Sequence, residues 1–408
     1  MLDVVTLGAW LEFAIRWLHV ITAIAWIGSS FYFIALDLGL HRDRTLPSGA
    51  DGEEWQVHGG GFYHIQKYMV APDNMPGDLT WFKWESYATW LSGVALLAVV
   101  YYWGAEFYLI DPAVMDISVP VAIGISAASL AVGWLIYDVL CKSPLKNNAT
   151  LLMVVLFVVL VAISFGYAQV FTGRAALLHV GAVTATIMTA NVFLVIIPNQ
   201  KVVVADLIAG RRPEPEYGRI AKLRSTHNNY LTLPVIFLML SNHYPLSFAT
   251  DNNWIIASLV FLMGVTIRHF FNSMHARKGR PWWTWGLSAL IFAAIMWLST
   301  APMHGADPEG EAMNGAATQF ASAEGFDEVQ NIVLGRCSMC HTAEPGWPGL
   351  HWAPKGVHLD TPARIAGQAR AIYLQAGLSH AMPPANLSWM EEEERESIIA
   401  WYNSATGG

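Results

Sequence analysis

Eight apolar runs, each long enough to cross a lipid bilayer, constrain this chain more than any other feature of its sequence. They cover residues 8–38, 84–103, 118–140, 150–171, 175–197, 228–245, 254–274 and 281–300. A helix of about 20 apolar residues spans the hydrocarbon core of a bilayer and satisfies its own backbone hydrogen bonds there. We therefore expect an all-α chain in which residues 1–300 form an eight-helix transmembrane bundle.

The charges between these runs predict an orientation. Fifteen Lys and Arg residues lie in loops that follow odd-numbered runs, whereas Arg174 alone lies in a loop that follows an even-numbered one. Because loops rich in Lys and Arg remain in the cytoplasm, both termini should lie on the periplasmic side. The basic residues gather in no single patch, so the expected partners include the lipid bilayer and exclude nucleic acid.

The chain changes character after residue 300. Residues 301–325 are rich in small residues, Pro and Gly, which predicts a linker. Residues 326–408 form a second, acidic segment that contains CSMCH, the spacing at which two thiols bind haem covalently. We predict a haem c on Cys337 and Cys340, with His341 as one axial ligand of the iron.

The opposite axial ligand should come from the stretch SHAMPPANLSWM. Met382 is the predicted ligand, because the two prolines after it hold the backbone extended and can direct its side chain at the iron. His380 is the rival ligand, and ordinary core packing is the alternative role for Met382. The order of CSMCH, MPP and a final acidic helix ending in IIAWY resembles a class I cytochrome c over about 80 residues. That resemblance implies a periplasmic electron-transfer domain.

Three histidines fall in the outer half of the predicted bundle, on three different helices: His19, His179 and His243. Two neutral imidazoles from neighbouring helices can hold a haem b, and we expect His19 with either His179 or His243 as its ligands. The alternative is that each histidine is hydrogen-bonded to a neighbouring helix. On the same face as His19, Glu12 and Arg16 are four residues apart and can neutralise each other.

A second polar cluster belongs to the inner half of the predicted bundle. RHFFNSMH places Arg268 and Asn272 on one helical face, STHNNY contributes His227, and the glycine-rich loop HGGGFYHIQK contributes His64. A guanidinium, an amide and imidazoles suit a planar anion rich in hydrogen-bonding groups. These four residues are therefore the predicted catalytic site, and a solvated cytoplasmic rim is the alternative interpretation.

Longer stretches of the chain point to one family. The runs WLHVITAIAWIGSSFYF, GGGFYHIQKYMVAP and LTWFKWESYATWLSG, together with the C-terminal haem segment, resemble the bacterial membrane-bound urate oxidases, also called urate hydroxylases. The resemblance covers essentially the whole chain. It implies a protein of the bacterial inner membrane that oxidises urate to 5-hydroxyisourate without producing hydrogen peroxide. It also implies that electrons pass to the fused cytochrome and then to a respiratory acceptor, either a cytochrome oxidase or a soluble cytochrome.

Two other functions fit the apolar runs and the haem motif without the resemblance. In one, the helices are a non-enzymatic conduit that carries electrons from quinol or another carrier to the cytochrome. In the other, the helices transport haem or a metal, and the cytochrome is appended. Reduction of the protein's own haem by urate, without added quinol, separates the enzyme from both.

Overall fold

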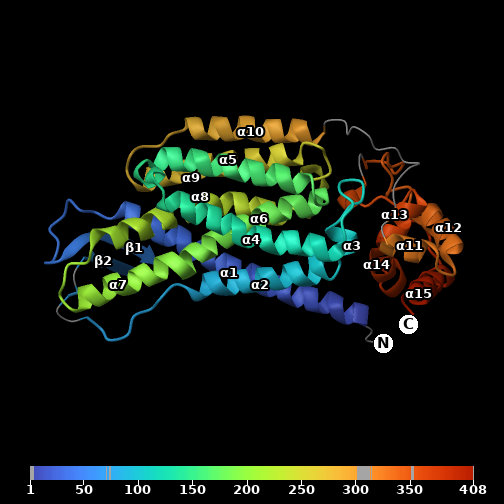
Figure 1. Ribbon diagram of the computed structural model, residues 1–408, viewed down its shortest axis with the longest axis horizontal. Coiled ribbons are helices and arrows are strands. Elements are labelled where there is room, and N and C mark those ends of the chain that lie inside the picture. The colour runs from blue at the N-terminus through green and yellow to red at the C-terminus, as the bar shows by residue number, and fades with distance from the viewer. Residues whose placement is uncertain are drawn as a thin grey trace.

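Two helical units make up the chain in its computed structural model, which describes residues 4–69, 71–72, 75–300, 313, 315–350 and 353–407. The first unit is a long bundle of helices, and the second is a smaller helical unit at one end of it (Figure 1). The described residues are mostly helical, in agreement with the fold class that the apolar runs predict.

The bundle has a helix at each of the eight predicted apolar runs. Its helices are α1 (Val4–Gly39), α2 (Trp84–Leu96), α4 (Val119–Lys142), α5 (Ala149–Ala168), α6 (Gly173–Ala190), α7 (Ile197–Ile208), α8 (Pro215–Ser241), α9 (Asn253–His275) and α10 (Trp283–Ser299). Shorter pieces are α3 (Ala105–Tyr108), the π-helical turn η1 (Leu97–Tyr102) after α2, and the π-helical turn η3 (Asn191–Ile196), which joins α6 to α7. Among the described residues, five stretches are long and apolar enough to cross a membrane: α1, α4, α5, α9 and the continuous α6–α7. Eight membrane crossings therefore stay a prediction.

Helix α8 begins at Pro215, well before the apolar run that starts at residue 228. Its additional turns carry Arg224, which the sequence-based orientation counts as a loop residue. Arg224 is only 2% exposed, and it forms an ion pair with Asp138 of α4 at 2.6 Å. A buried helix can include a charged residue when an opposite charge neutralises it. Hydropathy alone therefore places the start of this helix too late.

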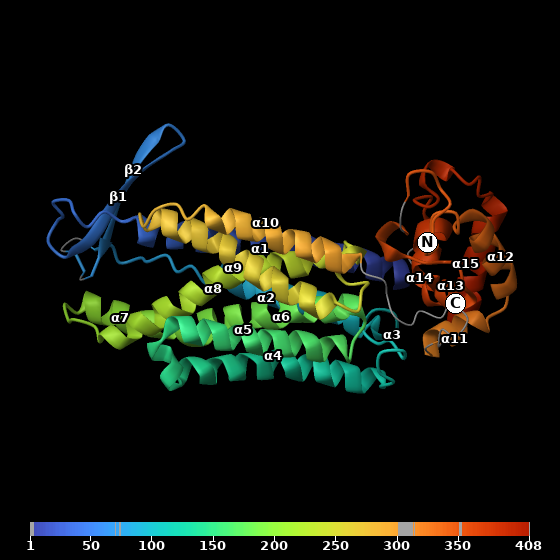
Figure 2. The ribbon, with the colours of Figure 1, turned by 90° about the horizontal axis from the view of Figure 1, so that it is seen from above.

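The prediction of an all-α chain is wrong for residues 50–68, which form a two-stranded antiparallel hairpin. Its strands are β1 (Ala50–His58) and β2 (Gly61–Tyr68). Gly59 and Gly60 have φ angles of +59° and +79°, the left-handed region that a two-residue hairpin turn requires. These glycines shape a turn in open space, where a Cβ would meet no heavy atom within 4 Å, and not a close approach to a ligand. Figure 2 shows the hairpin projecting sideways from the bundle, at the end away from the C-terminal unit.

Close helix crossings hold the bundle together. Helix α6 lies at its centre, and Val183 on this helix is fully buried. A Cβ at Gly133 of α4 would lie 2.5 Å from Val183, and a Cβ at Gly264 of α9 would lie 2.4 Å from the Pro234 ring of α8. Small residues at such crossings are typical of helix packing in membranes, because they let two backbones approach.

In the part that the structure describes, the C-terminal unit packs five helices around its own apolar core. They are α11 (Gly315–Ala321), α12 (Phe326–Arg336), α13 (Pro362–Gly367), α14 (Ala369–Ile372) and α15 (Glu392–Thr406), with turns η5 (Pro354–Gly356), η6 (Tyr373–Leu378) and η7 (Pro384–Asn386). Phe320 of α11 is buried in this core against Trp401 of α15. The described unit therefore begins at Gly315, inside the predicted linker 301–325. Most of that linker, residues 301–312 and 314, lies outside the described residues.

The two units meet at one end of the bundle. Phe107 of α3 lies 6.4 Å from Phe320, measured between ring centroids, and Val5 near the start of α1 packs on the same core. A second contact brings the turn η4 (Pro245–Ser247) of the bundle against η5, where a Cβ at Gly356 would lie 2.7 Å from Pro245. Any site in this half of the bundle is consequently close to the C-terminal unit.

Candidate functional site

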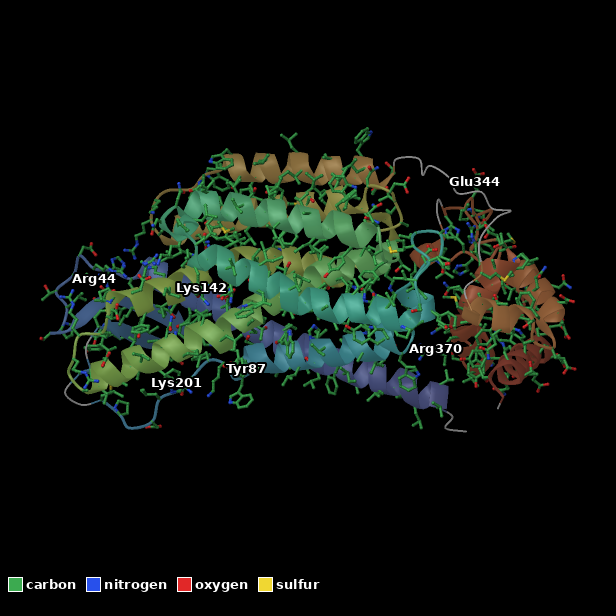
Figure 3. The ribbon with its side chains drawn as sticks, in the orientation of Figure 1. Arg44, Tyr87, Lys142, Lys201, Glu344 and Arg370 are labelled. Atoms are coloured by element: carbon green, nitrogen blue, oxygen red, sulfur yellow. The ribbon has the colours of Figure 1, made fainter. Side chains whose placement is uncertain are left out.

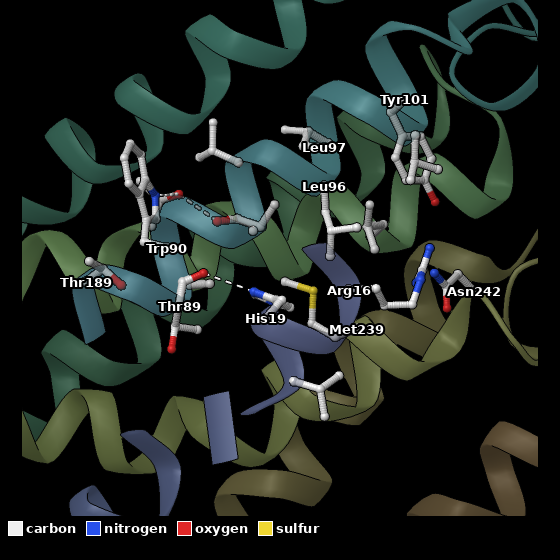
Figure 4. A pocket seen from close by; sticks show the side chains of 18 of the residues that line it. Arg16, His19, Thr89, Trp90, Leu96, Leu97, Tyr101, Thr189, Met239 and Asn242 are labelled. Atoms are coloured by element: carbon white, nitrogen blue, oxygen red, sulfur yellow. Dashed lines mark hydrogen bonds between the residues drawn. The ribbon is translucent and has the colours of Figure 1, made fainter. Parts of the chain in front are cut away.

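A cavity of about 190 Å³ lies in the half of the bundle nearer the C-terminal unit. Helices α1, α2, α6 and α8 contribute to its walls, which are mostly apolar. Its polar and aromatic lining includes Arg16, His19, Trp26, Thr89, Trp90, Tyr101, Asn242 and His243. Figure 4 shows Arg16 and Asn242 near Tyr101, with His19 directed toward Thr89. One guanidinium, one amide, two imidazoles and several aromatic rings thus line one space.

His19 is held in one orientation by α2. Its Nδ1 lies 3.0 Å from the Thr89 carbonyl oxygen and 3.1 Å from Ser92 Oγ. Because a carbonyl oxygen only accepts, Nδ1 carries the proton and donates it, which leaves the lone pair on Nε2. Gly93 makes room for the ring, since a Cβ there would lie 3.0 Å from His19 Cε1. His19 Nε2 is therefore able to accept a proton or to bind iron.

His243 lies at the edge of the same cavity and has three basic side chains in its neighbourhood. Arg16, Arg174 and Lys355 all act on this imidazole electrostatically. Arg16 donates to Glu12 at 2.7 Å, so one of the three cations has an acidic partner beside it. The remaining excess of positive charge favours an anion in or near the cavity. The sequence analysis did not assign Arg174 or Lys355 to a site. Arg174 directly follows a loop, and Lys355 belongs to the second unit, so no local pattern connects either residue with His243.

His179, the other predicted partner of His19, is fully buried with both ring nitrogens engaged. Nδ1 donates to the Ala175 carbonyl oxygen at 2.7 Å, and Nε2 accepts from Ser126 Oγ at 2.7 Å. A haem iron could take Nε2 only after the bond to Ser126 was broken. Of the two pairs predicted for haem b, His19 and His243 are the pair that lines one cavity.

Arg268 and Asn272 lie together, as their spacing on α9 predicts. Asn229 of α8 joins them: its Oδ1 accepts from Arg268 Nη2 at 3.2 Å and from Asn272 Nδ2 at 2.9 Å. Asn272 Oδ1 accepts from Arg268 Nη2 at 3.0 Å. The guanidinium lies 4.0 Å from the centroid of the Phe31 ring, and Arg268 is 5% exposed. Protein groups therefore already occupy much of the guanidinium's surface.

His227 belongs to a different network, centred on the Arg224–Asp138 ion pair. Its Nδ1 lies 2.8 Å from Tyr137 Oη, which accepts from Asn191 Nδ2 at 3.1 Å. Arg224 Nη1 donates to Asn191 Oδ1 at 3.1 Å. Sequence reasoning missed Arg224 and Asp138. The signal that was present is the spacing of Arg224 and His227, three residues apart on one helical face.

His64 lies on the hairpin, and its contacts are within the hairpin. Its Nε2 donates to Glu53 Oε2 at 2.7 Å, and its ring stacks on Trp55 with centroids 4.2 Å apart. The hydrogen bond from His64 holds the pKa of Glu53 below its usual range. The four residues of the predicted catalytic site thus fall into three separate groups.

The CSMCH segment follows α12 and forms a tight turn. The Cys340 and His341 amides both donate to the Cys337 carbonyl oxygen, at 3.1 and 3.0 Å, and both cysteines are free thiols. His341 Nδ1 donates to the Val357 carbonyl oxygen at 2.8 Å. This bond leaves Nε2 for a metal, which is the usual arrangement of an iron-binding histidine. The turn fits covalent attachment of a haem.

Met382 packs, half-buried, on the same core as Cys337. Its amide donates to the Gln375 carbonyl oxygen at 2.8 Å, and its carbonyl oxygen accepts from Arg395 Nη1 at 3.0 Å. The side chain of the rival ligand His380 is 66% exposed and lies beside Glu392. Met382 is therefore better placed than His380 to serve as the second ligand.

The helical bundle has a recognisable family. Residues 5–299 match the family described as Urate oxidase N-terminal, a match that runs from α1 to the end of α10. No curated protein and no solved structure gives a significant match to the chain. Because the family match covers well over half of the sequence, the chain belongs to the urate oxidase N-terminal family.

Proposed function

We propose that the chain is a membrane-bound enzyme that oxidises urate to 5-hydroxyisourate and passes the electrons to its C-terminal unit. In the balanced reaction, urate and one water molecule give 5-hydroxyisourate, two protons and two electrons. No hydrogen peroxide forms, because the electrons continue to a respiratory acceptor, either a cytochrome oxidase or a soluble cytochrome. Family membership supports urate as the substrate, and the long apolar helices support a membrane location.

The cavity that contains Arg16 and His19 is the observation that carries this proposal. Urate is a flat anion near neutral pH, with hydrogen-bonding groups around its edge. The rings of Trp90 and Tyr101 suit its faces, whereas Arg16 and Asn242 offer donors to its oxygens. The surrounding cations supply the charge that a desolvated anion needs.

His19 is the proposed base. Its Nδ1 proton is held by the Thr89 carbonyl oxygen, so Nε2 accepts the proton released when water adds to the urate ring. Proteins fix the tautomer of a functional histidine by a hydrogen bond from one ring nitrogen to a backbone carbonyl oxygen. The rest of the wall is mostly apolar, which lowers the local dielectric constant and so strengthens the attraction between urate and Arg16.

The C-terminal unit is the proposed acceptor. Cys337 and Cys340 would attach haem c, and His341 and Met382 would be its axial ligands. When bound, this group supplies a one-electron acceptor outside the bilayer. Haem b between His19 and His243 stays a prediction. It would compete with urate for the same cavity, and a pyridine haemochrome spectrum distinguishes the two occupants.

The sequence-based site at Arg268, Asn272, His227 and His64 also stays a prediction. Its weakness is that Arg268 is covered by Asn229, Asn272 and Phe31. Variants of Arg16 and Arg268 compared in one assay decide between the two locations.

Urate-driven reduction of the purified protein tests the proposed function. We expect urate to reduce the haem of the detergent-solubilised chain without added quinol, with formation of 5-hydroxyisourate and no hydrogen peroxide. Reduction by quinol but not by urate would instead support the electron conduit. Reduction by neither, in protein whose haem dithionite reduces, would support the transporter.

The haem assignment has its own test. A denaturing gel stained for haem peroxidase activity should show a signal at the full-length mass, since the attachment is covalent. The double variant Cys337→Ala/Cys340→Ala should lose that signal. A signal that survives in the double variant would show that the assignment is wrong.

A further inference from the structure

A second hollow, of about 300 Å³, lies where the bundle meets the C-terminal unit. Its polar lining includes Glu12, Arg16 and Tyr108 from the bundle, and Arg370 and Gln375 from the C-terminal unit. Arg16 lines both this hollow and the cavity that contains His19. The two spaces are therefore neighbours that share Arg16 as a lining residue.

The charges in this junction hollow favour an anion. Two arginines, Arg16 and Arg370, face one carboxylate, Glu12, which already accepts from Arg16 at 2.7 Å. Arg370 extends from the C-terminal unit toward the bundle, and its Nη2 would lie 3.9 Å from a Cβ at Gly8 of α1. Figure 3 shows Arg370 at the boundary between the two units.

The junction hollow is a polar opening beside Arg16, whereas much of the nearby helix surface is apolar. The outer faces of α1 and α10 expose large apolar side chains such as Trp17, Ile24 and Leu290. A charged molecule does not cross such a surface, because it would have to enter the lipid. A hollow with two arginines instead attracts anions from water and raises their local concentration.

We propose that the junction hollow is the route by which urate reaches the cavity, and that Arg370 steers the anion toward Arg16. This inference rests on the proposed function. Urate then arrives from the side of the membrane that carries the C-terminal unit. Arg370 acts on approach and binding, and it takes no part in the oxidation itself.

A charge series at Arg370 tests the route. We expect Arg370→Gln to raise the KM for urate about three- to tenfold with kcat unchanged, because a rim charge acts mainly on association. The KM of the wild type should rise with ionic strength, and that of Arg370→Gln should rise less steeply. Arg370→Lys keeps the charge and should stay close to the wild type. Arg280→Gln removes an exposed arginine at the opposite end of the bundle and should leave KM unchanged.

Two controls separate failure of the route from failure of the proposed function. All variants should take up the same amount of haem and unfold at the same temperature as the wild type. If urate does not reduce the wild type, the proposed function is wrong. If urate reduces the wild type but Arg370→Gln keeps the wild-type KM and salt dependence, the proposed route is wrong.

Oriented proteoliposomes test the direction of access independently of any variant. Protease added outside identifies the vesicles whose C-terminal units face outward. External urate should reduce the haem in the outward-facing fraction at once and leave the inward-facing fraction oxidised. Reduction confined to the inward-facing fraction would contradict access through the junction hollow.

Discussion

Arg224 and Arg268 are both buried in the half of the bundle away from the C-terminal unit, but their surroundings differ. Arg224 has a carboxylate partner, Asp138, at 2.6 Å. Arg268 has the amides of Asn229 and Asn272 and the face of the Phe31 ring. An amide or a ring stabilises a guanidinium less than an opposite charge does. Arg268 thus has no carboxylate among these contacts, whereas Arg224 has one, Asp138, which also pairs with the exposed Lys142 at 2.6 Å.

Breaking the buried ion pair between Arg224 and Asp138 should destabilise the bundle. Replacing one partner of a buried ion pair leaves the other charge uncompensated, at a typical cost of about 3–5 kcal/mol. We expect Arg224→Met to lower the unfolding midpoint in detergent, and Arg224→Met/Asp138→Leu to recover part of the loss. Arg211→Met breaks an exposed pair with Asp206 and should cost at most about 1 kcal/mol. Equal midpoints for Arg224→Met and Arg211→Met would contradict the role of the buried pair.

The Glu53–His64 pair should make the hairpin sensitive to acid. The hydrogen bond from His64 lowers the pKa of Glu53 below its ordinary value of 4.5. A carboxyl group with a lowered pKa stabilises the folded state above its unfolded pKa, and this contribution is lost as the pH falls through the folded pKa. We expect amide exchange of β1 and β2, corrected for its intrinsic pH dependence, to speed up as the pH falls below 4.5. Glu53→Gln should remove this pH dependence, and an unchanged profile in that variant would refute the assignment.

Residue spacing predicted part of the candidate site and could not predict the rest. Arg268 and Asn272 are four residues apart on one helix, so helical geometry alone brings them together. The positions of His64 and His227 depend on how separate elements pack, and their actual partners, Glu53 and Tyr137, are not the predicted ones. Of the cations near His243, Arg174 lies at the start of α6 and Lys355 in the second unit, and no local pattern in the sequence connects them.

At the scale of elements, hydropathy predicted the helices well and the hairpin not at all. Each apolar run contains a helix because a long apolar segment has few other ways to satisfy its backbone in a membrane. The segment ADGEEWQVHGGGFYHIQKY has no apolar run, so hydropathy gives no signal there. The alternation of residue types along this segment and its central glycines indicate a hairpin. The prediction of a glycine-rich loop did not use this signal.

The crossing of α8 and α9 should tolerate no side chain at Gly264. A Cβ there would lie 2.4 Å from the Pro234 ring, which is rigid and cannot move aside. Overpacking of this kind typically costs about 1–3 kcal/mol. We expect Gly264→Ala to lower the unfolding midpoint measurably. Gly286→Ala on α10 meets nothing within 4 Å and should be neutral or slightly stabilising. Equal midpoints for the two variants would contradict this packing.

At the scale of the whole molecule, the junction determines how closely the cavity and the C-terminal unit approach each other. The cavity, the junction hollow and the Met382 segment follow one another: Arg16 borders both spaces, and Gln375 borders the hollow while its carbonyl oxygen holds the Met382 amide. In the proposed function electrons pass between the units, and the rate of this transfer depends on the separation of the units. A substitution that opens the junction should therefore slow transfer without altering either unit internally.

Gly356 provides such a substitution. It has a φ of +63°, and a Cβ there would lie 2.7 Å from Pro245 of the bundle. We expect Gly356→Ala to slow urate-driven haem reduction while the haem content stays normal. Gly349 also has a positive φ, of +85°, but a Cβ there meets nothing within 4 Å. Gly349→Ala therefore carries a similar backbone cost without the contact and should reduce its haem at the wild-type rate. Similar slowing in both variants would show that the contact at Pro245 is unimportant.

Urate-driven haem reduction in Arg16→Gln and Arg268→Gln, measured side by side, tests the central claim most directly. Removing the arginine that pairs with a buried anion typically costs about 2–5 kcal/mol, thirtyfold or more in affinity. We predict that Arg16→Gln loses at least that much in kcat/KM for urate, whereas dithionite still reduces its haem fully. Arg268→Gln should keep most of its activity. Normal urate oxidation by Arg16→Gln together with an inactive Arg268→Gln would contradict the account and place the site in the inner half of the bundle.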